Sequence, residues 1–208
     1  MLCAVTQRNR PPTSYICGKV VKQIMILPIV AYGHPVLKKK AQDITPDYPG
    51  LKELIDSMFQ TMYHSNGVGL AAPQVNHSIR LFVVDGGPYA DEDPNLNGFK
   101  KVFINAHIVE EQGDKWRTDE GCLSIPGIRV DVERKPDICI RYCDEHFVQH
   151  EERYSGFAAR IIQHEYDHLE GILITDRISP LRRQMLKGKL NDISTGRIHT
   201  DYKMRFAK

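Results

Sequence analysis

The pattern His164-Glu165-Tyr166-Asp167-His168 has the residue types and spacing of a metal-binding helix. Positions i and i+4 share one face of a helix, so both imidazoles can bind one ion. Glu165 directly follows the first histidine and can accept a proton from water at that ion. A chance pair of histidines on a surface helix is the plainer interpretation, but the helix caps and the apolar opposite face disfavour it. The pattern therefore predicts a metallohydrolase.

A third protein ligand is needed, and two common kinds are missing. A metzincin carries histidine at position 174, where this chain has Ile174, and the thermolysin type needs a later glutamate, but none follows Glu170. Cys122 is the remaining candidate, because a thiolate binds Zn²⁺ or Fe²⁺ well and Gly121 lets backbone approach closely. A lone cysteine is more often a small buried hydrophobe, so this interpretation depends on the two histidines.

The segment GVGLAAPQ, residues 67–74, is rich in small residues that a ligand or another backbone can approach. The side-chain amide of Gln74 can donate a hydrogen bond to an oxyanion. Taken alone, the segment is equally well a glycine-bearing turn that leads into a strand. It lacks the Gly-Lys-Ser/Thr ending of a phosphate loop.

The remaining periodicities predict the elements that position these residues. An amphipathic helix spans 51–64, and a second helix runs from Ser155 as N-cap to Gly171 as C′ residue. A last helix begins at Ser179-Pro180. Apolar runs predict strands at 79–84, 102–109, 128–132, 137–142 and 147–153, and residues 86–100 read as a loop. We expect an α+β fold of short, mostly antiparallel strands packed around a central helix that carries the HExxH pattern, plus a C-terminal helix.

Composition indicates a soluble globular protein with one domain. The chain has 208 residues, of which 41% are hydrophobic and 26% charged. No apolar run approaches the ~18 residues that a membrane span needs, and no signal-peptide pattern is present. Five cysteines without a secretion signal favour reduced thiols. We therefore expect a cytoplasmic protein without a membrane partner.

Charge is distributed unevenly. Residues 25–176 carry 15 basic and 24 acidic residues, whereas residues 177–208 carry nine basic and two acidic residues. A basic tail on an acidic body suggests contact with a polyanion, and a solvated charged helix face is the alternative.

Residues 1–24 are basic, without acidic residues, and end just before a second methionine, Met25. One interpretation is a mis-assigned start with the protein beginning at Met25, followed by a single catalytic domain over 25–208. The other is an organelle targeting segment, which we favour less because the Arg/Ser amphipathic pattern of transit peptides is weak here.

Together, GVGLAAPQ, EGCLS and QHEYDH, in this order, closely resemble the three signature motifs of the peptide deformylases, over roughly residues 26–190. The resemblance implies a metal-dependent hydrolase that removes the N-formyl group from the initiator methionine of nascent polypeptides and releases formate. It implies one divalent ion, with Fe²⁺ favoured and Zn²⁺, Ni²⁺ or Co²⁺ as alternatives. It also implies N-formyl-methionyl nascent peptides as partners, and the ribosome as a partner of the basic C-terminal tail.

The resemblance also implies a role for each matching residue. Cys122, His164 and His168 match the metal ligands, Glu165 the general base, and Gln74 and the Leu123 N–H the oxyanion donors. Glu120 and Arg134 match an ion pair that steadies the cysteine loop. The expected substrate-binding residues are Gly67, Val68, Gly69, Glu120, Arg129, Phe157, Arg160 and Ile161.

Arg160 departs from the aliphatic lining of the family's methionine pocket, and we expect its stem to line the pocket while its head reaches water. Two other functions stay open at this point. One is a metallopeptidase of another class. The other is a zinc-stabilised binding module with Cys139 or Cys143 as a fourth ligand, which would leave Glu165 without a purpose.

Overall fold

The computed structural model describes residues 15–16, 19–20 and 24–207. Its α-helices are α1 (Leu51–His64), α2 (Gly156–Leu169) and α3 (Pro180–Ser194). Its strands are β1 (Tyr15–Ile16), β2 (Lys19–Val20), β3 (Ile29–Val30), β4 (Gly69–Ala71), β5 (Leu81–Asp85), β6 (Lys100–Gln112), β7 (Trp116–Cys122), β8 (Ile125–Arg134), β9 (Asp137–Cys143), β10 (Gln149–Ser155) and β11 (Met204–Arg205). The expectation for residues 1–24 falls almost wholly outside the described residues.

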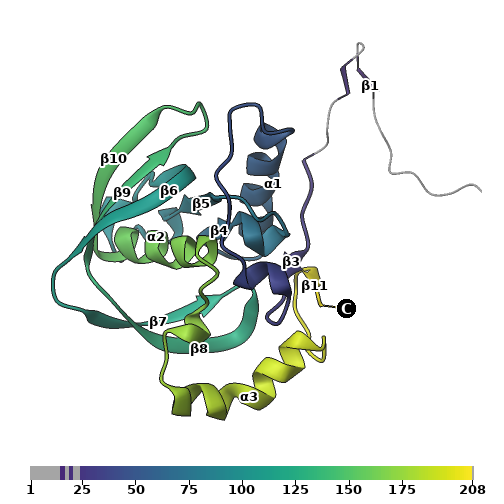
Figure 1. The fold of residues 1–208 in the computed structure, drawn as a ribbon, viewed down its shortest axis with the longest axis vertical. Coiled ribbons are helices and arrows are strands. Elements are labelled where there is room, and N and C mark those ends of the chain that lie inside the picture. The colour runs from purple at the N-terminus through teal and green to yellow at the C-terminus, as the bar shows by residue number, and fades with distance from the viewer. Residues whose placement is uncertain (1–14, 17–18, 21–23, 208) are drawn as a thin grey trace, which may run out of the picture.

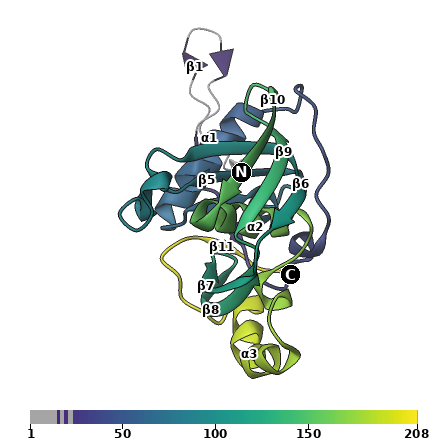
Figure 2. The ribbon, with the colours of Figure 1, turned by 90° about the vertical axis from the view of Figure 1, so that its left-hand side faces the viewer.

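A five-stranded antiparallel sheet forms one layer, in the order β10-β9-β6-β5-β4. Helix α2 packs on it, and the antiparallel β7–β8 hairpin lies on the other side of the helix (Figures 1 and 2). Buried side chains of α2, among them Ala159, Ile162 and Leu169, join Phe82 and Phe103 of the sheet in one apolar cluster. The expected α+β fold around a central helix is confirmed.

The ends of α2 follow the capping residues seen in the sequence. Ser155 is the N-cap residue and Gly171 follows the C-cap with φ +71°. A Cβ at Gly171 would also lie 2.8 Å from the backbone of Lys38, so only glycine fits. The helix is therefore fixed in length, which sets where its histidines lie.

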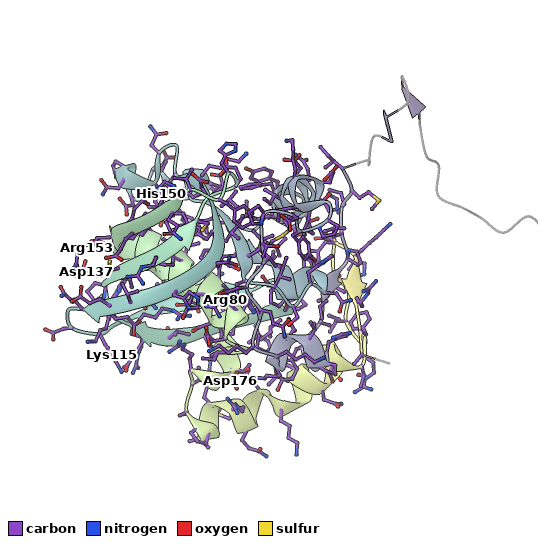
Figure 3. All side chains as sticks on the ribbon, turned by 45° about the horizontal axis from the view of Figure 1, so that its top comes forward. Arg80, Lys115, Asp137, His150, Arg153 and Asp176 are labelled. Atoms are coloured by element: carbon purple, nitrogen blue, oxygen red, sulfur yellow. The ribbon has the colours of Figure 1, made fainter. Side chains whose placement is uncertain are left out.

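Arg80 fastens the C-terminal end of α2 to the sheet. Its side chain is 2% exposed and lies inside the body (Figure 3). It donates to the Ala106 carbonyl and, at 2.7 Å, to the carboxylate of Glu170, the C-cap residue of α2. A buried guanidinium needs such partners, and here they tie the ligand-bearing helix to β6.

Helix α3 begins as expected, with the Ser179 Oγ accepting from the Arg182 N–H at 3.2 Å and proline in the first turn. The chain then returns across the body, where β11 pairs in parallel with β3. The N–H groups of Ile29 and Ala31 donate to the carbonyls of Lys203 and Arg205, each at 2.8 Å. This pairing was not expected from the sequence, and it holds the segment after α3 against the body.

Several other details differ from expectation. Strands β1, β2, β3, β4, β7 and β11 were not predicted, and the strand expected at 147–153 lies at Gln149–Ser155. The expected loop after β5 contains two short 3₁₀ turns, Gly87–Tyr89 and Pro94–Leu96. Among the described residues, the helices are too short or too polar to cross a bilayer.

Candidate active site

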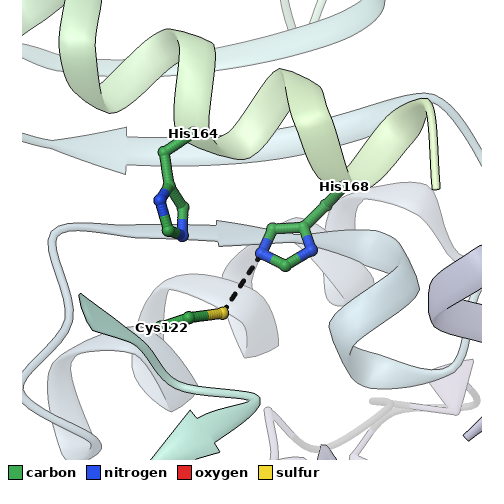
Figure 4. Close-up of side chains that lie close together, drawn as sticks. All are labelled: Cys122, His164 and His168. Carbon is green, nitrogen blue, oxygen red and sulfur yellow. Dashed lines mark hydrogen bonds between the residues drawn. The ribbon is translucent and has the colours of Figure 1, made fainter. Parts of the chain in front are cut away.

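Helix α2 and strand β7 bring three ligand side chains together. His164 and His168 extend from one face of α2 toward Cys122 at the end of β7 (Figure 4). One donor atom from each of the three lies within 4.8 Å of the others, and the Cys122 Sγ is 3.4 Å from the His168 Nε2. One thiolate and two imidazoles at this separation fit a single Zn²⁺ or Fe²⁺ ion with a position left for water.

The two histidines have different surroundings, which shift their pKa values in opposite directions. His168 is 2% exposed, and burial lowers its pKa well below the ordinary value, so its ring is neutral as a ligand must be. The Nδ1 of His164 lies 3.0 Å from the Glu120 carboxylate, which directs the Nε2 toward the ligand cluster. Burial alone would lower the pKa of His164, but Cys122 and Glu120 raise it well above the ordinary value.

Glu165 is the buried carboxylate beside the ligands. It is 4% exposed, and burial raises its pKa to about 7, although the charges of His164 and Arg134 oppose the shift. Its Oε2 has no hydrogen-bond partner among the described residues. A carboxylate that titrates near neutral pH and keeps a free oxygen is suited to move a proton.

Gln74 points its amide at the ligands. Its Oε1 accepts from the Ala71 N–H at 2.8 Å, so its NH₂ group faces the other way. That group lies 3.7 Å from the Cys122 Sγ and 3.3 Å from the Ser124 Oγ. The side chain is 2% exposed, so its NH₂ group is held beside the ligand cluster.

Glu120 is the centre of a buried charge network. It accepts from Arg134 at 2.7 and 2.9 Å, which places the ion pair that the resemblance implied, and from Arg160 at 2.9 Å. Burial would raise its pKa, but His164 and Arg134 hold it well below the ordinary value. Both carboxylate oxygens are engaged by protein groups, so Glu120 borders the cleft and orients His164 rather than offering a free oxygen to a substrate.

The expectation that the head of Arg160 reaches water is wrong. The side chain is 4% exposed, and its guanidinium donates to Glu120 and to the carbonyls of Val132 and Trp116. It also lies over the Trp116 ring, 4.4 Å from the centroid. The physical reason is Glu120, because a buried carboxylate draws a second guanidinium inward, where two carbonyl oxygens accept from its terminal nitrogens. Its Nε keeps no hydrogen-bond partner among the described residues.

A cleft of about 720 Å³ opens beside the ligands. Of the residues proposed from the sequence, it is lined by Gly67, Val68, Gly69, Gln74, Glu120, Cys122, Leu123, Arg129, Phe157, Arg160, Ile161, His164 and Glu165. His168 lies deeper, behind this lining. Arg129 is exposed at the mouth, where it pairs with Asp119.

Sequence reasoning missed several residues of the site. Asp167, inside the HExxH pattern, is 3% exposed and accepts from Arg134 at 2.8 Å and from Arg177 at 2.7 Å. The sequence feature that could have revealed Asp167 is an acidic residue on the buried face of a predicted helix. Tyr89 and Glu92 of the loop after β5 and residues 199–202 after α3 also line the cleft. The sequence gives no sign of these, because they reach the site only through the tertiary fold.

Comparisons with known proteins agree with this geometry. Residues 26–184 match the family described as polypeptide deformylase. A peptide deformylase of Christiangramia forsetii is 57% identical over 189 residues, which cover 88% of this chain and 96% of the relative. The crystal structure of peptide deformylase from Thermotoga maritima is similar with a TM-score of 0.67 and 43% identity, covering 74% of this chain and 99% of that one. The Met-Ala-Ser-bound class I type b peptide deformylase from Acinetobacter baumannii is similar with a TM-score of 0.68 and 36% identity, covering 75% and 100% of the two chains. The chain belongs to the peptide deformylase family.

Proposed function

We propose that this chain removes the N-formyl group from the initiator methionine of nascent polypeptides, with Glu165 as general base and Cys122, His164 and His168 as metal ligands. The observation that carries the proposal is the buried Glu165 carboxylate in the same cleft as the cluster of Cys122, His164 and His168, with an Oε2 that no other described group engages. A divalent ion in this ligand set supplies Lewis acidity and lowers the pKa of water toward about 7. We propose Fe²⁺ in the cell, with Zn²⁺, Ni²⁺ and Co²⁺ as ions that the same ligands accept.

The protein groups account for the proton and charge movements of amide hydrolysis. Glu165 takes a proton from the attacking water as its oxygen bonds to the formyl carbon. The developing oxyanion accepts from the Gln74 amide and the Leu123 N–H. Glu165 then gives the proton to the leaving nitrogen as the carbon–nitrogen bond breaks. Formate and a free methionine amine are the products.

The cleft supports a formyl-methionyl peptide as substrate. Val68, Phe157 and Ile161 provide apolar lining for an unbranched side chain, and Phe157 is held edge-to-face against Trp116 at 5.5 Å. Gly69 of the edge strand β4 lines the cleft, and Arg129 stands at the mouth. The Met-Ala-Ser ligand of the Acinetobacter relative is the deformylated product of such a substrate.

The ribosome is the proposed site of action, within the cytoplasm. Helix α3 exposes Arg182, Lys187 and Lys189, which form no ion pairs with other described residues. The helix also exposes Leu181 and Met185, at 73% and 69%. An exposed basic helix suits ribosomal RNA, whose phosphates attract cations.

The test compares formyl-Met-Ala with acetyl-Met-Ala in an anaerobic assay, with metal analysis of the same sample. We expect much faster hydrolysis of the formyl peptide, because small residues and the Glu165 carboxylate crowd the reacting carbon. Comparable rates on the two substrates would contradict the proposal. Cleavage of unformylated peptides would instead favour a metallopeptidase, the alternative that Cys122 as third ligand disfavours.

A further inference from the structure

The turn that carries Cys122 and Leu123 is poorly held by its own hairpin. Strands β7 and β8 pair regularly as far as Gly121 and Arg129, but Cys122 then pairs with Ile125 instead of continuing the register. The ladder therefore breaks at the metal ligand. Leu123 and Ser124, which connect the strands, both lack a positive φ. Two-residue turns that match the twist of a hairpin need positive φ, so this turn fits the twist of its own strands poorly.

Two backbone carbonyls of the turn are bound instead by groups from distant segments. The Tyr202 hydroxyl donates to the Leu123 carbonyl at 2.8 Å, across 79 positions of sequence. The N–H of Tyr32 donates to the Ser124 carbonyl, also at 2.8 Å. Tyr32 follows β3 and Tyr202 precedes β11, so the parallel β3–β11 pair presents both donors to the same turn.

The segment that bears Tyr202 is also part of the cleft. Residues 199–202 line it, and Tyr202 packs against the apolar cluster formed by α1 and β5. The Thr200 hydroxyl donates to the Tyr202 carbonyl at 2.7 Å, which shapes the approach to β11. This segment lies beyond residue 184, where the match to the family ends.

We infer that the β3–β11 pair clamps the turn at Leu123 and Ser124, and that Tyr202 is a positioning residue that holds the Leu123 N–H and the Cys122 ligand in place. The clamp follows from the contacts alone. Its consequence for catalysis rests on the proposed function, in which the Leu123 N–H donates to the oxyanion. An oxyanion donor acts mainly in the transition state, so a displaced turn lowers kcat more than it raises KM.

The experiment uses Tyr202→Phe in the full chain, which keeps the ring and removes only the hydroxyl. The control is Tyr48→Phe, which removes a tyrosine hydroxyl bonded to His77 at 3.2 Å, on the same apolar cluster but outside the cleft lining. Amide hydrogen exchange over residues 121–126 measures the clamp without any substrate. We expect several-fold faster exchange there in Tyr202→Phe, wild-type exchange in β5 and β6, and no change in the control.

Kinetics with formyl-Met-Ala then measure the consequence. We expect kcat to fall about three- to tenfold in Tyr202→Phe, with KM within about twofold and metal content unchanged. Unchanged exchange over 121–126, or an increase spread equally over β5 and β6, overturns the clamp. Faster local exchange with wild-type kcat overturns the positioning role. A wild-type protein inactive on formyl peptides refutes the proposed function instead, and the exchange data still decide the clamp.

Discussion

Gly69 leaves room for the Glu165 side chain because it has no Cβ. A Cβ at this position would lie 2.7 Å from the Cγ and Cδ of Glu165. We expect Gly69→Ala to displace the carboxylate and to lower kcat/KM by about 10²-fold or more while metal content stays near one per chain. Steady-state kinetics and metal analysis check this. In the control Gly188→Ala, a Cβ meets nothing within 4 Å, and α3 should gain about 0.5–1 kcal/mol of stability without a change in activity.

Substitutions of Glu165 and of Cys122 should both lower activity but should differ in their effect on metal content. Glu165→Gln keeps the size of the side chain but removes proton transfer, so activity should fall roughly 10²–10⁴-fold with metal retained. Cys122→Ala removes a ligand, so both metal and activity should be lost. Metal content and turnover of the purified variants are the measurements, and Cys143→Ala, a half-buried thiol at the end of β9, should change neither. The assignment of the site would be refuted if Glu165→Gln lost its metal while Cys122→Ala kept both its metal and its activity.

At this scale the sequence predicted which side chains gather at the cleft, because they lie in three short contiguous motifs. Gln74, Cys122 and His164 all line it, and their chemical roles stay predictions. The direction of the Arg160 side chain was predicted wrongly because its partners, Glu120, Trp116 and Val132, lie on the β7–β8 hairpin rather than on its own helix. A side chain with a fixed type but unknown neighbours has no predictable direction.

The elements were predictable where periodicity was strong. Helix α1 was predicted with the bounds that the structure gives, because its apolar stripe has one clear spacing. Strand β7 was missed because it reads Trp-Arg-Thr-Asp-Glu-Gly-Cys, in which alternation is carried by Glu120 and Thr118 rather than by aliphatic residues. Its buried face is a charge network, and hydrophobic patterning does not detect a buried carboxylate. Strands β3 and β11 are two residues each and have no periodicity to detect.

A polar cluster adds to the backbone pairing that joins the edge strand β10 to the sheet. Glu152 accepts from Lys101 of β6 at 2.7 Å and from Tyr142 of β9 at 2.8 Å, and it also contacts Tyr154. Burial would raise its pKa, but these hydrogen bonds lower it to about 2. A carboxyl with a depressed folded pKa stabilises the fold above its unfolded pKa, and this contribution is lost as pH falls toward the folded value.

Glu152→Gln should therefore lower the Tm at pH 7, and the difference from wild type should shrink between about pH 4.5 and pH 2. Thermal unfolding followed over this pH range is the measurement. Glu145→Gln, on the exposed turn between β9 and β10, should leave the Tm unchanged at pH 7. A Glu152→Gln deficit that grows as pH falls would show that the cluster does not hold an ionised carboxylate.

For the whole molecule, the charge on α3 is the feature that the ribosome proposal depends on. Deleting everything after Leu190 would also remove β11 and Tyr202, so substitutions are the cleaner change. Replacing Arg182, Lys187 and Lys189 by glutamine should weaken co-sedimentation with ribosomes at low salt. The slope of log affinity against log salt should become less negative by up to about 3, roughly one for each lost phosphate contact. Turnover of short formyl peptides should stay unchanged.

The matched control replaces Lys39, Lys52 and Lys115, three exposed lysines on other elements, so that the same net charge is removed. Equal loss of co-sedimentation in both triple variants would show that net charge alone governs binding. Unchanged binding in the α3 variant would show that its basic residues are a solvated helix face.

The parallel pairing of β3 with β11 also constrains the order of events during the protein's own synthesis. Ile29 emerges early from the ribosomal exit tunnel, but its partner Met204 emerges only after the sheet, the hairpin and α3 have been made. Pairing across such a long stretch of chain has a high loop-closure cost and forms late in folding. The ligand turn is therefore without its Tyr202 contact until residues 199–205 have left the tunnel. We expect full turnover only once this segment has paired with β3, so that a molecule whose C-terminal strand is still inside the tunnel acts more slowly.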